Sequence, residues 1–212
     1  MAKKTAWVCL FILGAAITTG SQTVDCLVAV VDGQALTLID LQIAREFGLF
    51  DREIRGKAGD PKVLVLDALV NLKVVLEVTR ELRPVDKAES EAALASLRDS
   101  VGPEAFQVKL KKFGLKENDL LPYLEDKIRF ERAVAARFNQ EIPVTRSAVE
   151  KFYLEVYAPE RKAQGLEPEP LSDLVAGLEA RLRASVKDTQ KSEWIKNIRA
   201  QAGIRINTDC LK

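Results

Sequence analysis

Hydrophobic residues recur at spacings of three and four along most of the chain, a pattern typical of amphipathic α-helices. The pattern is densest between Val63 and Leu82, where apolar residues occupy almost every face. A helix that is apolar all round is normally the central element of a core. Further helices are predicted over residues 37–48, 86–101, 103–114, 118–138 and 145–157, and over a last long segment, 172–202.

The predicted helices begin at residues whose side chains accept hydrogen bonds from the first free backbone N–H groups. Asn118 is chosen as one such cap because Pro122 then falls in the first turn, where a missing N–H costs little. The predicted caps are Thr37 with Asp40, Asp60 followed by Pro61, Asp86 with Glu89, Asn118, and Thr145.

Two short β-prone segments lie near the ends of the exported chain proposed below. Leu27–Val31 is closed by the turn signal Asp32-Gly33, and an alternating run follows Gly203. We therefore expect a mainly α protein with a two-stranded antiparallel sheet that pairs its N- and C-terminal strands. Residues 158–170 are rich in proline and glycine and are predicted to form a linker.

The N-terminus predicts export. Two lysines precede an apolar run, Ala6–Ile17, and small polar residues follow it, as in a secretory signal peptide over residues 1–20. The apolar run is shorter than the roughly 20 residues that span a bilayer, so we expect no stable membrane anchor. Cleavage near Gly20 would leave residues 21–212 as one exported domain and change the net charge from +1 to −1.

Cysteine count changes with that cleavage. Cys9 would leave with the signal peptide, so that Cys26 and Cys210 remain. An even number of cysteines in an exported chain predicts a disulfide. A register that pairs Val30 with Ile206 would also place Cys26 opposite Cys210. The alternative is two unrelated small apolar residues.

Composition excludes much enzyme chemistry. The chain contains no histidine and three cysteines, which excludes histidine-based triads, histidine-ligated zinc and a four-cysteine site. Near-neutral charge does not favour a nucleic acid partner. The glycine-containing loop Arg55–Gly59 lacks the order of a phosphate-binding loop. We therefore predict no catalytic, metal-binding or cofactor-binding residue and no cofactor.

Several degenerate motifs follow one another along the chain. Residues 30–37 are similar to V-N-G-x-x-I-T and residues 66–73 to L-x-x-L-I-x-x-x-L-L. Residues 106–120 are similar to F-x-x-x-L-x-x-x-G-L, and residues 142–153 to i-x-V-T-x-x-E-V-x-x-Y-Y. In this order, with Trp194 and residues 204–206 as the closing helix and strand, they resemble the N-terminal chaperone domain of the SurA family of periplasmic chaperones and prolyl isomerases.

The chain departs from this family in three respects. Isomerase domains normally follow the Y-Y helix, but here only the segment 158–170 is available, too short for a domain of that kind. Parvulin active sites also generally contain histidine. Lys116 replaces the usual Ser or Thr cap, which moves the expected cap to Asn118. The resemblance therefore implies a chaperone domain without isomerase activity.

The resemblance implies an ATP-independent holdase that binds unfolded exported polypeptides, by analogy outer-membrane proteins, in an apolar groove. Phe47, Leu49 and Phe50 are the predicted client-binding residues because they cluster where a helix ends beside a flexible loop. Their alternative assignment is the core. The alternative function is a non-catalytic adaptor that binds one folded envelope partner.

Overall fold

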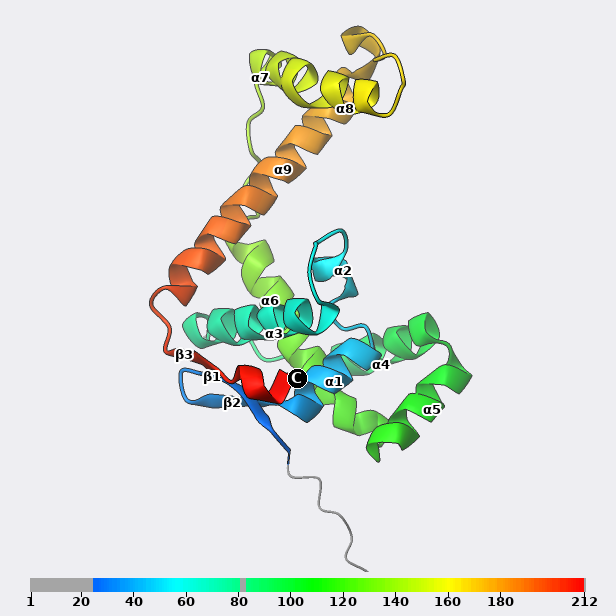
Figure 1. Cartoon of the computed structure of the whole chain (residues 1–212), viewed down its shortest axis with the longest axis vertical. Helices are drawn as coiled ribbons and strands as arrows, with labels where there is room; N and C mark the ends of the chain where they lie inside the picture. The colour runs from blue at the N-terminus through cyan, green and yellow to red at the C-terminus, as the bar shows by residue number, and fades with distance from the viewer. Residues whose placement is uncertain (1–24, 81–82, 212) are drawn as a thin grey trace, which may run out of the picture.

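The computed structural model describes residues 25–80 and 83–211 (Figure 1). The predicted signal peptide, residues 1–20, and its cleavage point near Gly20 lie outside these residues. A search of the described residues finds no helix with the length and apolar character needed to cross a membrane. The described chain is mainly α-helical with one small antiparallel sheet, which confirms the predicted fold class.

The first two thirds of the chain form a body of helices with a small sheet at one side (Figure 1). Its elements are β1 (Leu27–Val31), β2 (Gln34–Thr37), α1 (Leu38–Glu46), α2 (Asp51–Ile54), α3 (Pro61–Val78), α4 (Lys87–Val101), α5 (Pro103–Phe113), the 3₁₀ turn η1 (Glu117–Leu120) and α6 (Leu121–Arg137).

The rest of the chain leaves the body and returns to it. Figure 1 shows one long helix, α9, running from the far end of the molecule back to the body, with α7 and α8 at its outer end. We call residues 146–182 the distal lobe. The elements of this part are α7 (Arg146–Phe152), the π-helical turn η2 (Tyr153–Tyr157), α8 (Ala158–Ala163), α9 (Leu171–Arg199), β3 (Ile204–Ile206) and the 3₁₀ turn η3 (Thr208–Leu211).

Helix α3 is the centre of the body, as its pattern predicted. It contacts β1, α1, α2, α6 and α9, so neighbours cover it on most sides. Its exposed apolar side chains are at its ends, where Val63 and Val78 are about half exposed, while the polar Asp67 is exposed near its middle. Asp60 caps its first turn by accepting a hydrogen bond from the Lys62 N–H. The buried side chains of α3 are Val65, Leu66, Leu69, Val70, Leu72, Val74, Val75 and Leu76.

The sheet has three strands in the order β2-β1-β3, one more than the sequence predicted. The extra strand, β2, follows from the turn at Asp32 and Gly33. Both residues have positive φ, 47° and 83°, as in the two-residue turns that match the twist of a hairpin. This turn folds the next residues back onto β1 and pairs Val31 with Gln34.

The predicted register of the terminal strands is wrong by one residue. Ile206 pairs with Ala29, not Val30. Contacts at the end of β1 fix this register: the Gly203 N–H donates to Asp32 Oδ1 at 2.6 Å, and the Asp32 N–H donates to the Gly203 carbonyl at 3.1 Å. These two hydrogen bonds fix the start of β3 relative to β1. The alternation of apolar and polar residues in the two strands does not specify that register.

A disulfide nevertheless joins Cys26 to Cys210. Continued along the observed register, β3 would place Asp209 opposite Cys26. The chain instead turns into η3 directly after the strand, and this turn brings the Cα atom of Cys210 to 5.9 Å from that of Cys26. That spacing is common for disulfides. The two ends of the described chain are therefore joined covalently across a separation of 184 residues.

Three of the predicted helix caps are present. Thr37 and Asp40 form a reciprocal capping box, and Thr145 accepts a hydrogen bond from the Ala148 N–H, like Asp60 at α3. The predicted box of Asp86 and Glu89 is absent. Asp86 pairs with Arg83 and Glu89 pairs with Arg132 on α6, so nearby cations take the carboxylates that would have capped the helix.

The predicted cap at Asn118 is also wrong. Asn118 lies inside η1, where the Lys116 N–H donates to Asp119 Oδ2 at 2.7 Å. Pro122 does fall in the first turn of the following helix, α6, as expected. The carboxylate that caps this region is therefore Asp119, not Asn118. It stabilises the start of the 3₁₀ turn η1, which leads into α6.

The predicted linker is partly helical. Residues 158–163 form α8. Pro159 is accommodated because it lies in the first turn of this helix, and the turn before it is π-helical. The Ala158 N–H donates to the carbonyl of Tyr153, five residues earlier, which is the π-helical pattern. Gly165 then ends the helix with a positive φ of 73°. Only residues 164–170 match the expected irregular connection.

We predict that removing the disulfide lowers the free energy of unfolding. Closing so long a loop restricts the unfolded chain, so Cys26→Ser should cost about 2–5 kcal/mol. Urea unfolding followed by circular dichroism measures the change. Reductant should shift the wild-type midpoint to that of the variant and leave the variant itself unmoved. An unshifted wild-type midpoint would contradict the bond's contribution.

Asp40 also joins α1 to α6. Its Oδ1 accepts a hydrogen bond from the Tyr123 hydroxyl at 2.7 Å, while its Oδ2 serves the capping box with Thr37. Burial, and next the hydrogen bond to the Asp40 carboxylate, raise the pKa of Tyr123 above its usual value of 10. The neutral phenol is therefore the form that the folded protein favours.

This shift predicts a loss of stability at alkaline pH. Above pH 10 the unfolded chain releases the Tyr123 proton while the folded chain retains it, so the free energy of unfolding falls as pH rises towards the raised native pKa. The fall should be steeper in the wild type than in Tyr123→Phe. Urea titrations at pH 9, 10 and 11 compare the two; parallel profiles would show that Tyr123 ionises normally in the native state.

Candidate functional site

The three predicted client-binding residues lie in the core. Phe47 is 2% exposed, Leu49 5% and Phe50 3%. The Phe47 ring packs edge-on against Phe106, with ring centroids 5.6 Å apart, and also contacts Phe113. Phe47 and Leu49 therefore do not form an open groove, and this prediction is wrong for them. Phe50 alone reaches the wall of a cavity.

The end of α1 explains this burial. Gly48 adopts a left-handed conformation, with φ of 64°, and its N–H donates to the Arg45 carbonyl. The Leu49 N–H then donates to the Ala44 carbonyl at 2.9 Å, which completes a Schellman motif. In that motif the residue after the glycine commonly packs back onto its own helix. The sequence Gly48-Leu49 at the end of a helix therefore indicates that Leu49 is buried in the core.

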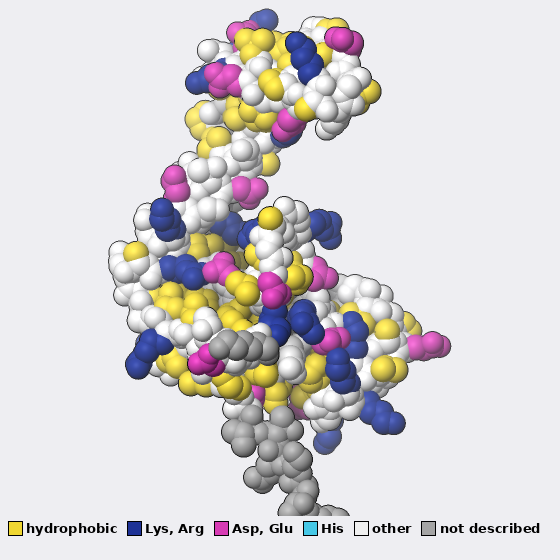
Figure 2. All heavy atoms as spheres, viewed as in Figure 1, with side chains coloured by type: hydrophobic (Ala, Val, Ile, Leu, Met, Phe, Trp, Pro, Cys, Tyr) yellow, Lys and Arg dark blue, Asp and Glu magenta, His cyan; other side chains and the backbone are white. Residues whose placement is uncertain are grey.

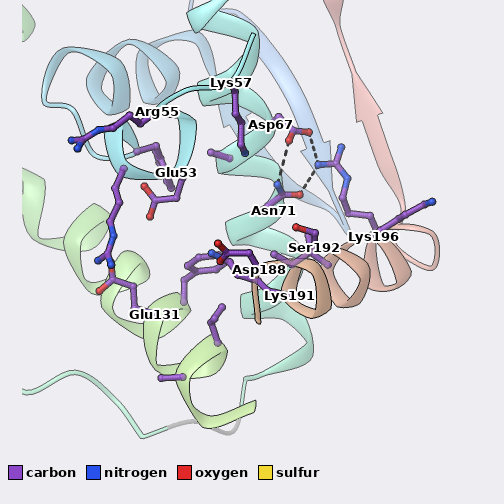
Figure 3. A pocket seen from close by; sticks show the side chains of 18 residues that line it. Glu53, Arg55, Lys57, Asp67, Asn71, Glu131, Asp188, Lys191, Ser192 and Lys196 are labelled. Carbon is purple, nitrogen blue, oxygen red and sulfur yellow. Dashed lines mark hydrogen bonds and ion pairs between the residues drawn. The ribbon is translucent and has the colours of Figure 1, made fainter. Parts of the chain in front are cut away.

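A cavity of about 1090 Å³ lies where α9 meets the body (Figure 3). Its walls come from four regions: the segment around α2, and helices α3, α6 and α9. Side chains of both charge signs surround it. The lining residues are Phe50, Arg52, Glu53, Arg55, Lys57, Asp67, Ala68, Asn71, Phe130, Glu131, Val134, Ala135, Asp188, Lys191, Ser192, Ile195, Lys196 and Arg199.

The apolar part of the lining is anchored in the core. Phe130 on α6 is 6% exposed and Ile195 on α9 is 8% exposed, and both belong to the main hydrophobic cluster. Phe50, which is 3% exposed, contributes a second buried ring. Ala135 lies on α6 at the exposed side of the cavity. The cavity therefore combines an apolar surface, fixed by the core, with polar groups around it.

Lys127 holds the α2 wall of the cavity. Its Nζ lies 3.1 Å from Glu53 Oε1 and donates a hydrogen bond to the Leu49 carbonyl. The same ammonium group lies 5.2 Å from the centroid of the Phe50 ring, within cation–π range. The other carboxylate oxygen of Glu53 is buried and has no hydrogen-bond partner among the residues that the structure describes. Lys127 on α6 thus neutralises the Glu53 carboxylate and positions the segment around α2 that carries Glu53.

A second polar cluster fixes α9 against α3. Arg199 Nη1 lies 2.6 Å from Asp67 Oδ1 and 2.6 Å from Asn71 Oδ1, and Asn71 in turn donates to Asp67. Figure 3 draws these contacts at one side of the cavity. Because Arg199 is the last residue of α9, this cluster and the buried Ile195 fix the end of the helix that closes the cavity.

Apolar side chains are also exposed away from the cavity. Figure 2 shows them on the body and on the distal lobe, interspersed with charged groups. In the distal lobe Leu154 is 67% exposed, and only Val149 and Leu178 are buried among its described residues. The lobe is therefore built mainly on half-buried contacts.

The cavity residues on α6 and α9 are not among the site residues predicted from the sequence. The apolar residues of α9 that recur at steps of four do not include Ile195: they are Leu174, Leu178, Leu182, Val186, Trp194 and Ile198. Asp188, Ser192, Ile195 and Arg199 recur every three or four residues and form a mixed stripe beside them. This mixed stripe indicates a second face on the helix. The residues of α3 and α6 that lie opposite it depend on how α9 packs against the body, which the sequence does not show.

No protein-family model matches the chain, and a search of curated proteins finds no match. Among the described residues there is no group of three or more histidine, cysteine, aspartate or glutamate side chains that could hold a metal ion. What the cavity offers chemically is apolar contact area next to charged groups, an arrangement suited to binding.

We predict that Lys127 is needed for stability. Lys127→Met would leave the Glu53 carboxylate without its partner in a largely buried site and should cost about 1–3 kcal/mol. Adding Glu53→Gln should recover part of that loss, because the uncompensated charge is removed. Urea unfolding measures both variants.

The matched control is Lys151→Met, which removes the same group from an exposed pair with Glu155. It should change the free energy of unfolding by less than about 0.5 kcal/mol. Equal effects of Lys127→Met and Lys151→Met would contradict the assigned role of Lys127.

Proposed function

We propose that this protein is a periplasmic, ATP-independent chaperone that holds unfolded exported polypeptides, outer-membrane proteins among them. The observation that carries the proposal is the cavity between the body and α9, in which buried apolar side chains lie beside charged ones. Unfolded segments present the same mixture of apolar and polar groups. Burying their apolar side chains would contribute about 25 cal/mol per Å² removed from water.

The size of the cavity favours a polypeptide over a small metabolite. Its volume of about 1090 Å³ lies at the upper limit of the roughly 300–1,000 Å³ typical of small-molecule sites. Small-molecule sites also tend to be mostly apolar with few polar groups, whereas ten charged side chains line this one. A broad and chemically mixed surface of this kind suits segments of varied sequence.

The resemblance to SurA-family chaperone domains supports the same proposal from the sequence. It covers most of residues 27–207, and the strand, turn and helix cap at 30–37 have the order that it implies. The disulfide between Cys26 and Cys210 fits an exported protein, because such bonds persist in oxidising compartments. A chaperone domain without an inserted isomerase would act by binding alone.

We predict that the purified protein suppresses aggregation of a urea-denatured outer-membrane protein after dilution, measured by light scattering without nucleotide. Ala135→Gln should weaken suppression several-fold, because a longer polar side chain would occupy the cavity and cover its apolar surface. Ala136→Gln is the matched control: the neighbouring alanine on α6 is also exposed but is not among the residues that line the cavity.

Two results would contradict this proposal. Aggregation that proceeds unchanged at stoichiometric excess of the protein would exclude a holdase. Stable binding to one folded envelope protein, with no affinity for unrelated unfolded chains, would favour the adaptor function instead. Equal suppression by both glutamine variants would place client binding outside the cavity.

A further inference from the structure

Positive charges outnumber negative ones around the cavity when the side chains that form ion pairs within the protein are left out. Among the described residues, three of its four carboxylates have a cationic partner: Glu53 and Glu131 pair with Lys127, and Asp67 pairs with Arg199. Asp188 has no such partner. Five cations of the lining form no ion pair with any described residue: Arg52, Arg55, Lys57, Lys191 and Lys196.

The unpaired charge at the cavity is therefore strongly positive, although the whole chain carries only +1. The excess comes from both sides of the opening. Figure 3 shows Arg55 and Lys57 on the segment that follows α2, and Lys191 and Lys196 on α9. Cations on opposite walls of a concave site reinforce one another and raise the local concentration of anionic groups.

Lys191 brings one of these charges to the apolar surface. Its side chain is partly buried, and its Nζ lies 6.0 Å from the centroid of the buried Phe130 ring. A carboxylate that met this ammonium group would be next to apolar side chains, where water screens the attraction less than on an open surface. Apolar contact and charge recognition therefore occur in the same place.

We propose, building on the chaperone function above, that the cavity selects unfolded segments in which acidic side chains flank apolar ones. The apolar side chains would pack against Phe130 and Ile195, and the carboxylates would pair with Lys191 and with Lys57 or Lys196. A nucleic acid fits less well, because a continuous phosphate backbone would also face Asp188 and the other carboxylates of the lining.

Fluorescence anisotropy with three versions of one apolar peptide tests this selection. The versions carry Glu, Gln or Lys at the same flanking positions. At low salt the Glu peptide should bind about tenfold more tightly than the Lys peptide, and the difference should shrink as salt rises, because screening weakens exposed charge pairs. Lys191→Glu should reverse the order of the two charged peptides.

Two further variants serve as controls. The first separates the charge of Lys191 from the packing of its side chain, and the second tests whether any charge change on α9 has the same effect. Lys191→Met keeps the apolar stem over Phe130 and should remove most of the preference without loss of stability in urea. Lys187→Glu makes the same charge change one turn earlier on α9, at a partly buried lysine outside the cavity lining, and should leave the order of the peptides unchanged.

The outcomes distinguish the two proposals. Equal binding of all three peptides would overturn the acidic preference and leave the holdase standing, whereas no binding of any peptide would overturn both. A Lys187→Glu effect as large as that of Lys191→Glu would show that the cavity does not set the preference. Displacement of the Glu peptide by single-stranded DNA at equal charge concentration would identify a general polyanion site and overturn the proposal.

Discussion

The fold depends on the burial of α3. Its apolar residues occupy nearly every face, so the helix is stable only if other elements cover it on all sides. The sheet, α1, α2 and α6 supply part of that cover, and α9 supplies the rest from the far end of the chain. The return of α9 is thus a requirement of the core, and the position of the cavity follows from it.

The chain ends reinforce this arrangement. After α9, β3 joins the sheet beside β1, and the disulfide ties the following turn to the residue before β1. Lys62, at the start of α3, also donates to the carbonyl of Leu211 at 2.7 Å. These contacts hold the C-terminal end of α9 against the body, so α9 reaches the distal lobe from a fixed base.

The cavity forms because α9 closes the core only at one end. Ile195 and Arg199 fasten it to the body, while its other end carries the distal lobe outward (Figure 1). Between these points the helix presents a mixed face to α2, α3 and α6 across the cavity. A site in this position can combine core-anchored apolar rings with charged side chains, which suits the binding of varied segments.

The longer helices and several of their ends could be predicted from local pattern, because apolar spacing, Asp60-Pro61 and Gly48 act through neighbouring residues. The short helices α2 and α8 were not predicted. Contacts between distant residues decided the rest. Asp32 with Gly203 set the strand register, and Arg132 removed Glu89 from its expected cap. Likewise, the cavity unites residues up to about 150 positions apart, so only the packing of α9 could show that Lys57 and Lys196 share one opening while Phe47 lies in the core.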